Sequence, residues 1–342
     1  MKQFNTLSLY ALLFSMLFIF SCGDDETPPP GLQVELEDNY VLVLNEGNFN
    51  VGNSSITGYS LSDDEHIQNL FSEVNERPLG DVVQSAANAN GKICLIVNNS
   101  GTIEVVDEDN FGSEISISGL NSPRHLITLD DDRALVTDID SLISEVNLST
   151  GTIVSQIDAG DWSEFITKRA DDILFSYPNQ KKLGVITDLS ISSTIELPGF
   201  PAAMVQTDDN SVWALCQVMQ WDNSQMVLVR IDEGSSEVNE SFEFTGGAGF
   251  GLRMKAFEET LYLLVGDLFK FEYNSDSAPN LFIEGGDRTL YGLGVDPESE
   301  DVYLSDAKDY TQQGTVDRYN STGTLLDSFT SGINPGEFYF YE

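Results

Sequence analysis

A unit of two short strands joined by a polar turn recurs along this chain, and this repeat limits the possible folds more than any other feature. In residues 91–110 (GKICLIVNNSGTIEVVDEDN), a turn leads into an apolar run, a polar turn follows, and a run of alternating apolar and polar residues completes the unit. The apolar runs of the seven copies begin at Val41, Ile93, Ala134, Ile173, Val212, Leu261 and Val302. The period is therefore about 40 residues, which is typical of a β-propeller blade of four antiparallel strands.

Other repeat folds fit this pattern poorly. Leucine-rich, ankyrin and tetratricopeptide repeats have different periods or need helices. No sustained apolar stripe with a helical period follows the first twenty residues. The chain of 342 residues is long enough for one large repeat domain, and we predict an all-β fold.

The two ends of the repeat array predict how the ring closes. The first copy begins directly with its apolar strand, residues 41–44, and lacks a preceding innermost strand. Beyond the last copy the chain continues as residues 332–342 (GINPGEFYFYE), in which residues 338–341 form a short aromatic strand. We expect this strand to pair into blade one, so that residues 40–342 form a seven-bladed β-propeller without an open edge.

The first residues indicate export and a lipid anchor. Residues 1–21 combine Lys2 with an apolar run too short to span a bilayer, as in a signal peptide. The run ends in Ile-Phe-Ser-Cys, which resembles the bacterial lipobox and implies cleavage before Cys22 and lipidation of that residue. The acidic residues that follow resemble the signal that sends Bacteroidetes lipoproteins to the outer face of the outer membrane. Residues 22–39, which include three consecutive prolines, are predicted to be a tether.

The charge of the chain excludes several classes of partner. Lys and Arg number 16 against 56 for Asp and Glu, which gives a net charge of −40. Such a polyanion repels nucleic acid and anionic membrane surfaces, so we expect membrane contact only through the lipid anchor.

The cysteines and motifs predict neither a disulfide nor a metal centre. Cys94 and Cys216 fall in the apolar strands of repeats two and five, which are not neighbours in a ring, so both are interpreted as small buried hydrophobic residues. No C-x-x-C, H-E-x-x-H, P-loop or G-x-S-x-G motif occurs. His66 is expected in a polar outer turn. His125 follows Pro123 and Arg124 at the mouth, where a structural role is favoured over contact with a ligand. We therefore predict no cofactor and no catalytic residue.

Strand order assigns the loops to two faces. With the strands of each blade labelled A to D from axis to rim, the A–B turns fall on one face and are strongly acidic, as in residues 130–132. The B–C and D–A loops fall on the other face, here called the mouth, and carry aromatic residues and several of the scarce cations. Loops of a rigid ring converge on its opening, where a ligand can be enclosed from many sides. The predicted ligand-binding residues are Asn45, Glu46, Asn48, Arg77, Asn98, Arg124, Trp162, Glu164, Tyr177, Trp221, Tyr291 and Tyr310.

Several segments carry a family resemblance. Residues 95–107 and 134–154 resemble YVTN-type surface-layer propeller repeats. Residues 43–48 (VLNEGN), 77–81 (RPLGD) and 97–100 (VNNS) resemble the YncE-like propeller lipoproteins of Bacteroidetes that carry the domain of unknown function DUF5074. The better understood members, the BtuG-type lipoproteins, bind cobalamin and sit on a TonB-dependent outer-membrane transporter. The resemblance thus implies a seven-bladed ring, a corrinoid as candidate ligand and a transporter as partner.

Three functions remain open on the sequence. The first is a cell-surface protein that captures a bulky solute at the mouth and passes it to a transporter. The second is a scaffold whose mouth docks a partner protein. The third is a Ca²⁺-dependent hydrolase of the lactonase kind, for which Glu46, Glu164, Asp138 and Asp306 would supply oxygen ligands.

Overall fold

The computed structural model of the chain describes residues 31–36, 40–62, 65–247, 251–274 and 277–341. The predicted signal peptide, Cys22 and the tether as far as residue 30 lie outside these residues, as do residues 37–39. Residues 31–342 form one compact unit. Within the described part of the chain, no helix is both long enough and apolar enough to cross a membrane.

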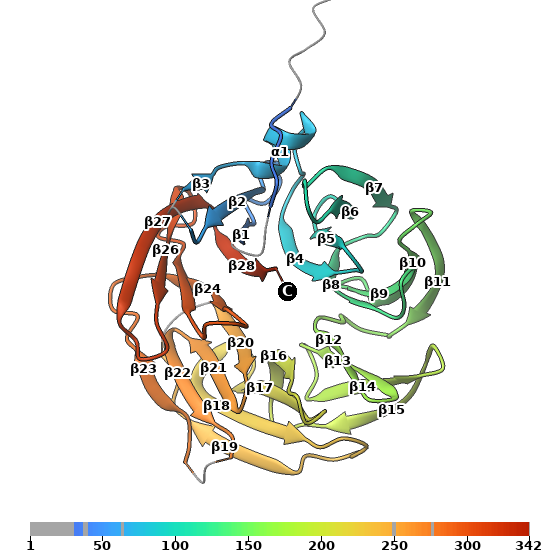
Figure 1. Cartoon of the computed structure of the whole chain (residues 1–342). Helices are drawn as coiled ribbons and strands as arrows, with labels where there is room; N and C mark the ends of the chain where they lie inside the picture. Colours follow the sequence, from blue (N-terminus) through green and yellow to red (C-terminus); the bar gives the residue numbers. More distant parts are fainter. Residues whose placement is uncertain (1–30, 37–39, 63–64, 248–250, 275–276, 342) are drawn as a thin grey trace, which may run out of the picture. The chain divides into compact units, whose positions relative to one another are not determined.

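Seven antiparallel sheets of four strands each are arranged in a ring (Figure 1). From the inner to the outer strand, blade one consists of β28 (Pro335–Phe340), β1 (Tyr40–Asn45), β2 (Ser55–Ser60) and β3 (His66–Ile67). In the same order, blade two consists of β4 (Val83–Asn88), β5 (Lys92–Val97), β6 (Thr102–Asp107) and β7 (Ser113–Ser118), and blade three of β8 (Pro123–Thr128), β9 (Arg133–Asp138), β10 (Leu142–Asn147) and β11 (Thr152–Asp158). Blade four consists of β12 (Ile166–Arg169), β13 (Asp172–Tyr177), β14 (Lys182–Thr187) and β15 (Ser190–Glu196). Blade five consists of β16 (Phe200–Gln206), β17 (Val212–Met219), β18 (Asp222–Ile231) and β19 (Glu240–Phe244). Blade six consists of β20 (Leu252–Phe257), β21 (Thr260–Val265), β22 (Asp267–Glu272) and β23 (Asn280–Ile283). Blade seven consists of β24 (Leu290–Val295), β25 (Val302–Asp306), β26 (Gln313–Tyr319) and β27 (Leu325–Ile333). The predicted fold class and blade number are confirmed.

The C-terminal strand closes the ring as predicted. β28 pairs antiparallel with β1, with Phe340 opposite Val41 and Phe338 opposite Val43. The strand begins at Pro335, three residues before the expected start, and ends at Phe340. Because β28 takes the inner position of a blade whose other strands come from the beginning of the sequence, the first and last parts of the repeat array share one sheet.

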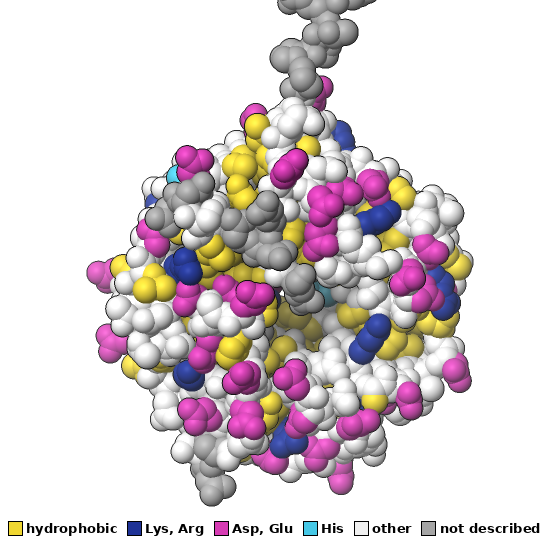
Figure 2. Space-filling view, in the orientation of Figure 1, with side chains coloured by type: hydrophobic (Ala, Val, Ile, Leu, Met, Phe, Trp, Pro, Cys, Tyr) yellow, Lys and Arg dark blue, Asp and Glu magenta, His cyan; other side chains and the backbone are white. Residues whose placement is uncertain are grey.

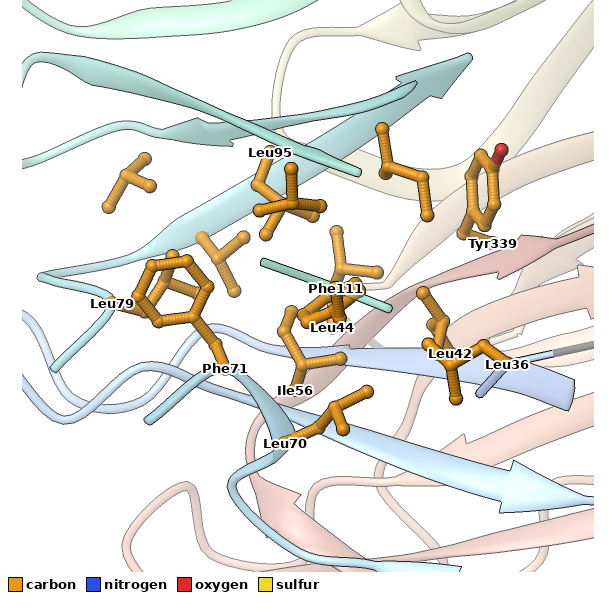
Figure 3. Packing of buried hydrophobic residues seen from close by; sticks show 14 of the residues in the cluster. Leu36, Leu42, Leu44, Ile56, Leu70, Phe71, Leu79, Leu95, Phe111 and Tyr339 are labelled. Carbon is orange, nitrogen blue, oxygen red and sulfur yellow. The ribbon is translucent and has the colours of Figure 1, made fainter. Parts of the chain in front are cut away.

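The second strand of each blade is apolar on both faces because it packs between two neighbouring blades. In β5, Leu95 and Val97 pack against blade one, whereas Cys94 and Ile96 pack against blade three. Figure 3 shows the cluster between blades one and two, to which Leu95 of β5 and Leu44 of β1 both belong. Among the described residues, one such cluster lies at each of the seven interfaces between blades. The core is thus a ring of interfaces and not a single centre.

Both internal cysteines are buried and free, as expected. Cys94 belongs to the cluster between blades two and three, and Cys216 to the cluster between blades four and five. Burial raises the pKa of each thiol to about 12, so both remain protonated and apolar.

Blade one departs from the expected pattern of strands alone. Its outer strand β3 has only two residues, and the short helix α1 (Leu70–Asn75) follows it and contacts β2. Leu70 and Phe71 are the buried residues of α1 (Figure 3). His66, expected in a turn, lies in β3, and its ring centroid is 6.5 Å from that of Phe329. The helix therefore does much of the covering that an outer strand provides in the other blades.

Residues 31–36, which fall within the predicted tether, lie on the propeller. The backbone N–H of Leu32 donates to the carbonyl of Glu73 at 2.8 Å, and that of Leu36 to the carbonyl of Asp109 at 2.7 Å. Leu36 is buried in the cluster between blades one and two. This segment therefore connects α1 with the outer part of blade two.

Candidate functional site

A cavity of about 450 Å³ opens at the mouth of the ring. Its wall is built from the beginnings of inner strands, such as Gln84 of β4 and Arg253 of β20, and from the loops that the mouth was predicted to contain. Figure 2 shows the other face of the ring, on which the A–B turns lie, and this face is also hollowed at its centre. A volume of this size falls within the usual range for small-molecule sites.

Seven of the twelve predicted ligand-binding residues line this cavity. They come from six of the blades and are far apart in the sequence: Glu46, Asn98, Arg124, Trp162, Glu164, Trp221 and Tyr291. The convergence of loops on a common opening was the basis of their prediction, and the fold brings these seven together.

The other five predicted residues are not part of the cavity wall. Asn45, the last residue of β1, is fully buried, and its side chain bonds to Thr57 and to Ser331. Asn48 donates to the carbonyl of Tyr310 at 2.7 Å, which joins the loops of blades one and seven. These three predicted residues, Asn45, Asn48 and Tyr310, therefore support the loops of the mouth.

Arg77 and Tyr177 are also engaged elsewhere. Arg77 follows α1, where its guanidinium pairs with the buried Glu104 at 2.6 Å and lies over the ring of Phe71. The unpredicted helix changes the path of this connection and takes Arg77 away from the mouth. Tyr177 is buried at the end of β13, and its hydroxyl donates to the carbonyl of Ala159 at 3.0 Å.

A buried ion pair orients one of the tryptophans. The Arg124 guanidinium donates to both oxygens of Glu164, at 2.8 Å from Nε and 2.6 Å from Nη2, and to Gln84 at 2.6 Å. The indole N–H of Trp162 donates to the same carboxylate at 2.6 Å. Burial alone would raise the pKa of Glu164, but Arg124 and these hydrogen bonds lower it below its usual value. Glu164 is therefore ionised and fixes the edge of the Trp162 ring.

On the opposite side of the cavity, Glu46 lies between an arginine and a tyrosine. Its Oε2 accepts a hydrogen bond from the Tyr291 hydroxyl at 2.7 Å, and its Oε1 lies 3.7 Å from Nη2 of Arg253. The longer separation makes Arg253 a weaker partner than Arg124 is for Glu164. Burial therefore dominates and raises the pKa of Glu46, and burial together with the Glu46 charge raises the pKa of Tyr291.

The third ion pair of the cavity involves the closing strand. Glu337 of β28 pairs with Lys255 of β20, and burial, which would raise the Glu337 pKa, is outweighed by Lys255 and Arg253, which lower it. His125 of β8 packs on the Phe165 ring at 4.7 Å, and burial lowers its pKa to about 4. His125 is consequently neutral near pH 7.

The charges around the cavity therefore balance. Three carboxylates, from Glu46, Glu164 and Glu337, face three cationic side chains, from Arg124, Arg253 and Lys255. No unpaired charge of this group is available to a charged ligand, whose own desolvation would remain uncompensated. The wall nevertheless offers hydrogen-bonding groups, because Asn98, Gln84 and Gln217 also line it.

Aromatic side chains form the rim above these charges. The rings of Trp162 and Trp221 are stacked, with centroids 6.4 Å apart and planes inclined by 29°. Trp221 is 69% exposed, and Phe49 on the loop between β1 and β2 is 66% exposed. Indole and phenyl rings left in water on a rigid loop favour a binding role, because their burial against a ligand is strongly favourable.

Several residues of the wall were not among the predicted set. Arg253 and Glu337 lie on inner strands, and Phe49, Gln84, Phe165 and Asn334 also contribute. One signal was present in the sequence: Arg253 and Lys255 are two scarce cations spaced by two in β20, so both point to the same side of the strand. That side is the one that faces the other inner strands.

The residues considered for calcium do not gather at one point. Asp138 accepts hydrogen bonds from the backbone N–H groups of Asn121 and Ser122, and Asp306 from those of Thr289 and Lys308. Glu46 and Glu164 are held by arginines. Within the described ranges, no group of three or more His, Cys, Asp or Glu residues could hold a metal ion.

Comparison with known proteins identifies the family to which the chain belongs. The family model described as a domain of unknown function, DUF5074, matches residues 39–341. No curated protein matches the chain.

Solved structures share the fold at low sequence identity. A quinonprotein alcohol dehydrogenase-like protein from Bacteroides thetaiotaomicron has a TM-score of 0.71 at 17% identity, over 89% of this chain and 78% of that one. Hydrazine synthase from Kuenenia stuttgartiensis has a TM-score of 0.61 at 12% identity, over 73% and 86% of the two chains. The Cps50 (Swd1) propeller domain from Myceliophthora thermophila has a TM-score of 0.59 at 13% identity, over 75% and 89%. At these identities the likeness concerns the fold alone.

Proposed function

Since the chain belongs to the DUF5074 family, whose function is unknown, its role has to be argued from the site, and we propose that it is a solute-binding protein. The solute would enter the cavity at the mouth and leave unchanged. The observation that carries this proposal is the combination of three balanced ion pairs in the wall with exposed aromatic rings at the rim.

The balance of charge favours an uncharged solute. A charged ligand would have to displace one partner of an existing ion pair, which leaves the other charge buried and unpaired. The net charge of −40 adds a repulsion against anions. Amide and hydroxyl groups, in contrast, can exchange hydrogen bonds with Asn98, Gln84 and Gln217 without disturbing the ion pairs.

The same balance argues for binding without chemistry. A general base needs a carboxylate that is free to take a proton. Glu164 and Glu337 are held in ion pairs that lower their pKa values, and Glu46, whose pKa burial raises, accepts a hydrogen bond from the Tyr291 hydroxyl. His125 is half-buried, and its pKa of about 4 is too low for it to act as an acid near neutral pH.

We further propose the cellular context from the sequence. The lipobox-like segment that ends at Cys22 supports an outer-membrane lipoprotein that faces the exterior. The resemblance to BtuG-type lipoproteins supports delivery to a TonB-dependent transporter and makes a corrinoid the first ligand to test. A corrinoid is bulky, carries many amide groups and has a flat ring system, which suits an aromatic rim above hydrogen-bonding walls.

Calorimetric titration tests the proposal. The compact unit that begins at Gly31 is titrated with cyanocobalamin and with a panel of neutral glycans and siderophores. We expect saturable binding of at least one uncharged compound, and Trp162→Ala should weaken it at least about tenfold because this residue lines the cavity. Val154→Ala, at an exposed position of β11, is the matched control. Absence of binding across the panel would refute the proposal.

A further inference from the structure

Trp221 occupies a backbone position that is unfavourable for tryptophan. β17 and β18 are joined by the two-residue turn of Gln220 and Trp221, because Met219 pairs with Asp222. Trp221 has φ of 64°, in the left-handed region that favours glycine or asparagine. A bulky residue there is strained, and its side chain, which stacks on Trp162, is still 69% exposed.

The turn that carries Trp221 is held in place. The backbone N–H of Trp221 donates to Oε1 of Gln217 at 3.1 Å, and Gln217 in turn donates to Asn223 at 2.6 Å. The side chain of Gln220 donates to Asn179 of blade four at 3.0 Å. The exposed indole is therefore preorganised, and it is not a side chain on a free loop.

A second fixed aromatic stands on the other side of the mouth. Phe49 belongs to the loop between β1 and β2, while Trp221 belongs to blade five, which is three blades away by one route round the ring and four by the other. The Phe49 loop is fixed by hydrogen bonds from Asn48 to Asn53 at 2.7 Å and to Tyr310 at 2.7 Å. Both rings line the cavity, and both are more than 60% exposed.

From this arrangement we propose that Phe49 and Trp221 are opposed contacts that hold, above the cavity, the flat apolar face of a solute too large for it. The inference rests on the proposed function and adds the ligand class: an uncharged solute with a flat apolar face and a polar edge. The polar edge enters the cavity, where amides and ion pairs line the wall. On this proposal the strain at Trp221 is maintained because the turn presents the ring to the projecting part of the solute.

Single substitutions separate binding from folding. Trp221→Asn removes the ring and its stacking on Trp162 but places at the turn a residue that tolerates a positive φ, so the melting temperature should change little. Phe49→Ser removes the opposite ring. We expect each variant to raise the Kd for cyanocobalamin by at least about tenfold, and the double variant to raise it further than either single variant.

Met219→Ser is the matched control, because Met219 is 66% exposed on the same hairpin but does not line the cavity. It should leave the Kd unchanged. If native protein binds cyanocobalamin and Trp221→Asn and Phe49→Ser bind it equally well, the inference fails while the proposed function stands. Equal weakening by Met219→Ser would also overturn the inference. If native protein does not bind cyanocobalamin at all, both the corrinoid proposal and the inference fail.

Discussion

Three hydrogen bonds converge on the buried carboxylate of Glu164, two from Arg124 and one from the indole of Trp162. The carboxylate thus joins an inner strand, β8, to the rim of the mouth. Its ionised form is needed for all three contacts, which makes Glu164 the residue on which the order of this side of the cavity depends.

We predict that Glu164→Ala is strongly destabilising. The substitution leaves the guanidinium of Arg124, whose side chain is 16% exposed, without its partner, which typically costs about 3 to 5 kcal/mol. Chemical denaturation measures the loss. The exposed pair of Asp130 and Arg133 supplies the control, because Asp130→Ala removes only this pair and two turn hydrogen bonds and should cost at most about 1 kcal/mol. A loss for Glu164→Ala no larger than that of the control would contradict the assignment of a buried ion pair.

His125 predicts how stability depends on pH. Burial lowers its pKa to about 4 from 6.5, so in the window between these values the unfolded chain takes up a proton that the folded chain refuses. The free energy of unfolding should therefore fall as the pH drops through this window, by about 3 kcal/mol.

The variant His125→Asn isolates this effect. Asparagine cannot be protonated in this range, so the pH profile of the variant should be flatter than that of native protein between about pH 7 and about pH 4. His66→Asn, at an exposed position of β3, controls for loss of a histidine elsewhere. Parallel profiles of native protein and His125→Asn would show that His125 is not buried in its neutral form.

At the scale of elements, β28 has two roles. It closes the ring by pairing with β1, and it brings Glu337 into the cavity wall. Its Phe338 is buried between blades one and seven, with its ring centroid 5.9 Å from that of Tyr303. Closure of the fold and completion of the site therefore depend on the same strand.

We predict that Phe338→Ala destabilises the whole ring. Loss of a buried phenyl ring typically costs about 3 to 5 kcal/mol, because it removes apolar burial and leaves a cavity. Urea denaturation should show this loss in a single transition. Leu326→Ala, at an exposed position of β27, should change stability little. A separate early transition for blade one, with the rest of the ring intact, would contradict closure by β28.

The elements differ in how far the sequence predicts them. The second and third strands of each blade could be predicted, because burial on both faces imposes apolar runs and the turns between them are short and polar. The helix α1 could not, since its six residues are fewer than two full turns and leave no periodic pattern. The presence of this helix also explains why the prediction that Arg77 lies at the mouth is wrong.

The residues of the site that lie on loops could be predicted from the sequence, whereas those on inner strands could not. Trp162 and Trp221 were identified because aromatic residues in loops are unusual. Arg253 and Glu337 were not, because the side of an inner strand that faces the cavity depends on how the sheets are arranged round the ring. The spacing of Arg253 and Lys255 indicates a shared side, but only the closed ring shows what that side faces.

At the scale of the whole molecule, a net charge of −40 surrounds a cavity whose own charges are paired. The acidic A–B turns contribute to this charge, and Figure 2 shows Asp and Glu side chains distributed over the blades round the central hollow. The surface charge therefore acts on charged solutes at long range, whereas an uncharged solute meets only the paired groups of the wall.

Salt should accordingly have little effect on binding. For an uncharged solute we expect the Kd to change by less than about threefold between about 0.05 M and about 0.5 M NaCl, because no long-range attraction is screened. Titration of the panel at both salt concentrations measures this. A steep rise of the Kd with salt would indicate that the ligand is a cation attracted by the acidic surface.

Hydrogen–deuterium exchange with and without the bound solute tests the central claim most directly, because it reports where on the ring the ligand lies. The account predicts slower exchange in residues 46–54, 159–165 and 217–223, which form the mouth, and unchanged exchange in the A–B turns at residues 129–132 and 207–211. Protection of the A–B turns, or of outer strands with the mouth unprotected, would contradict a binding site at the mouth.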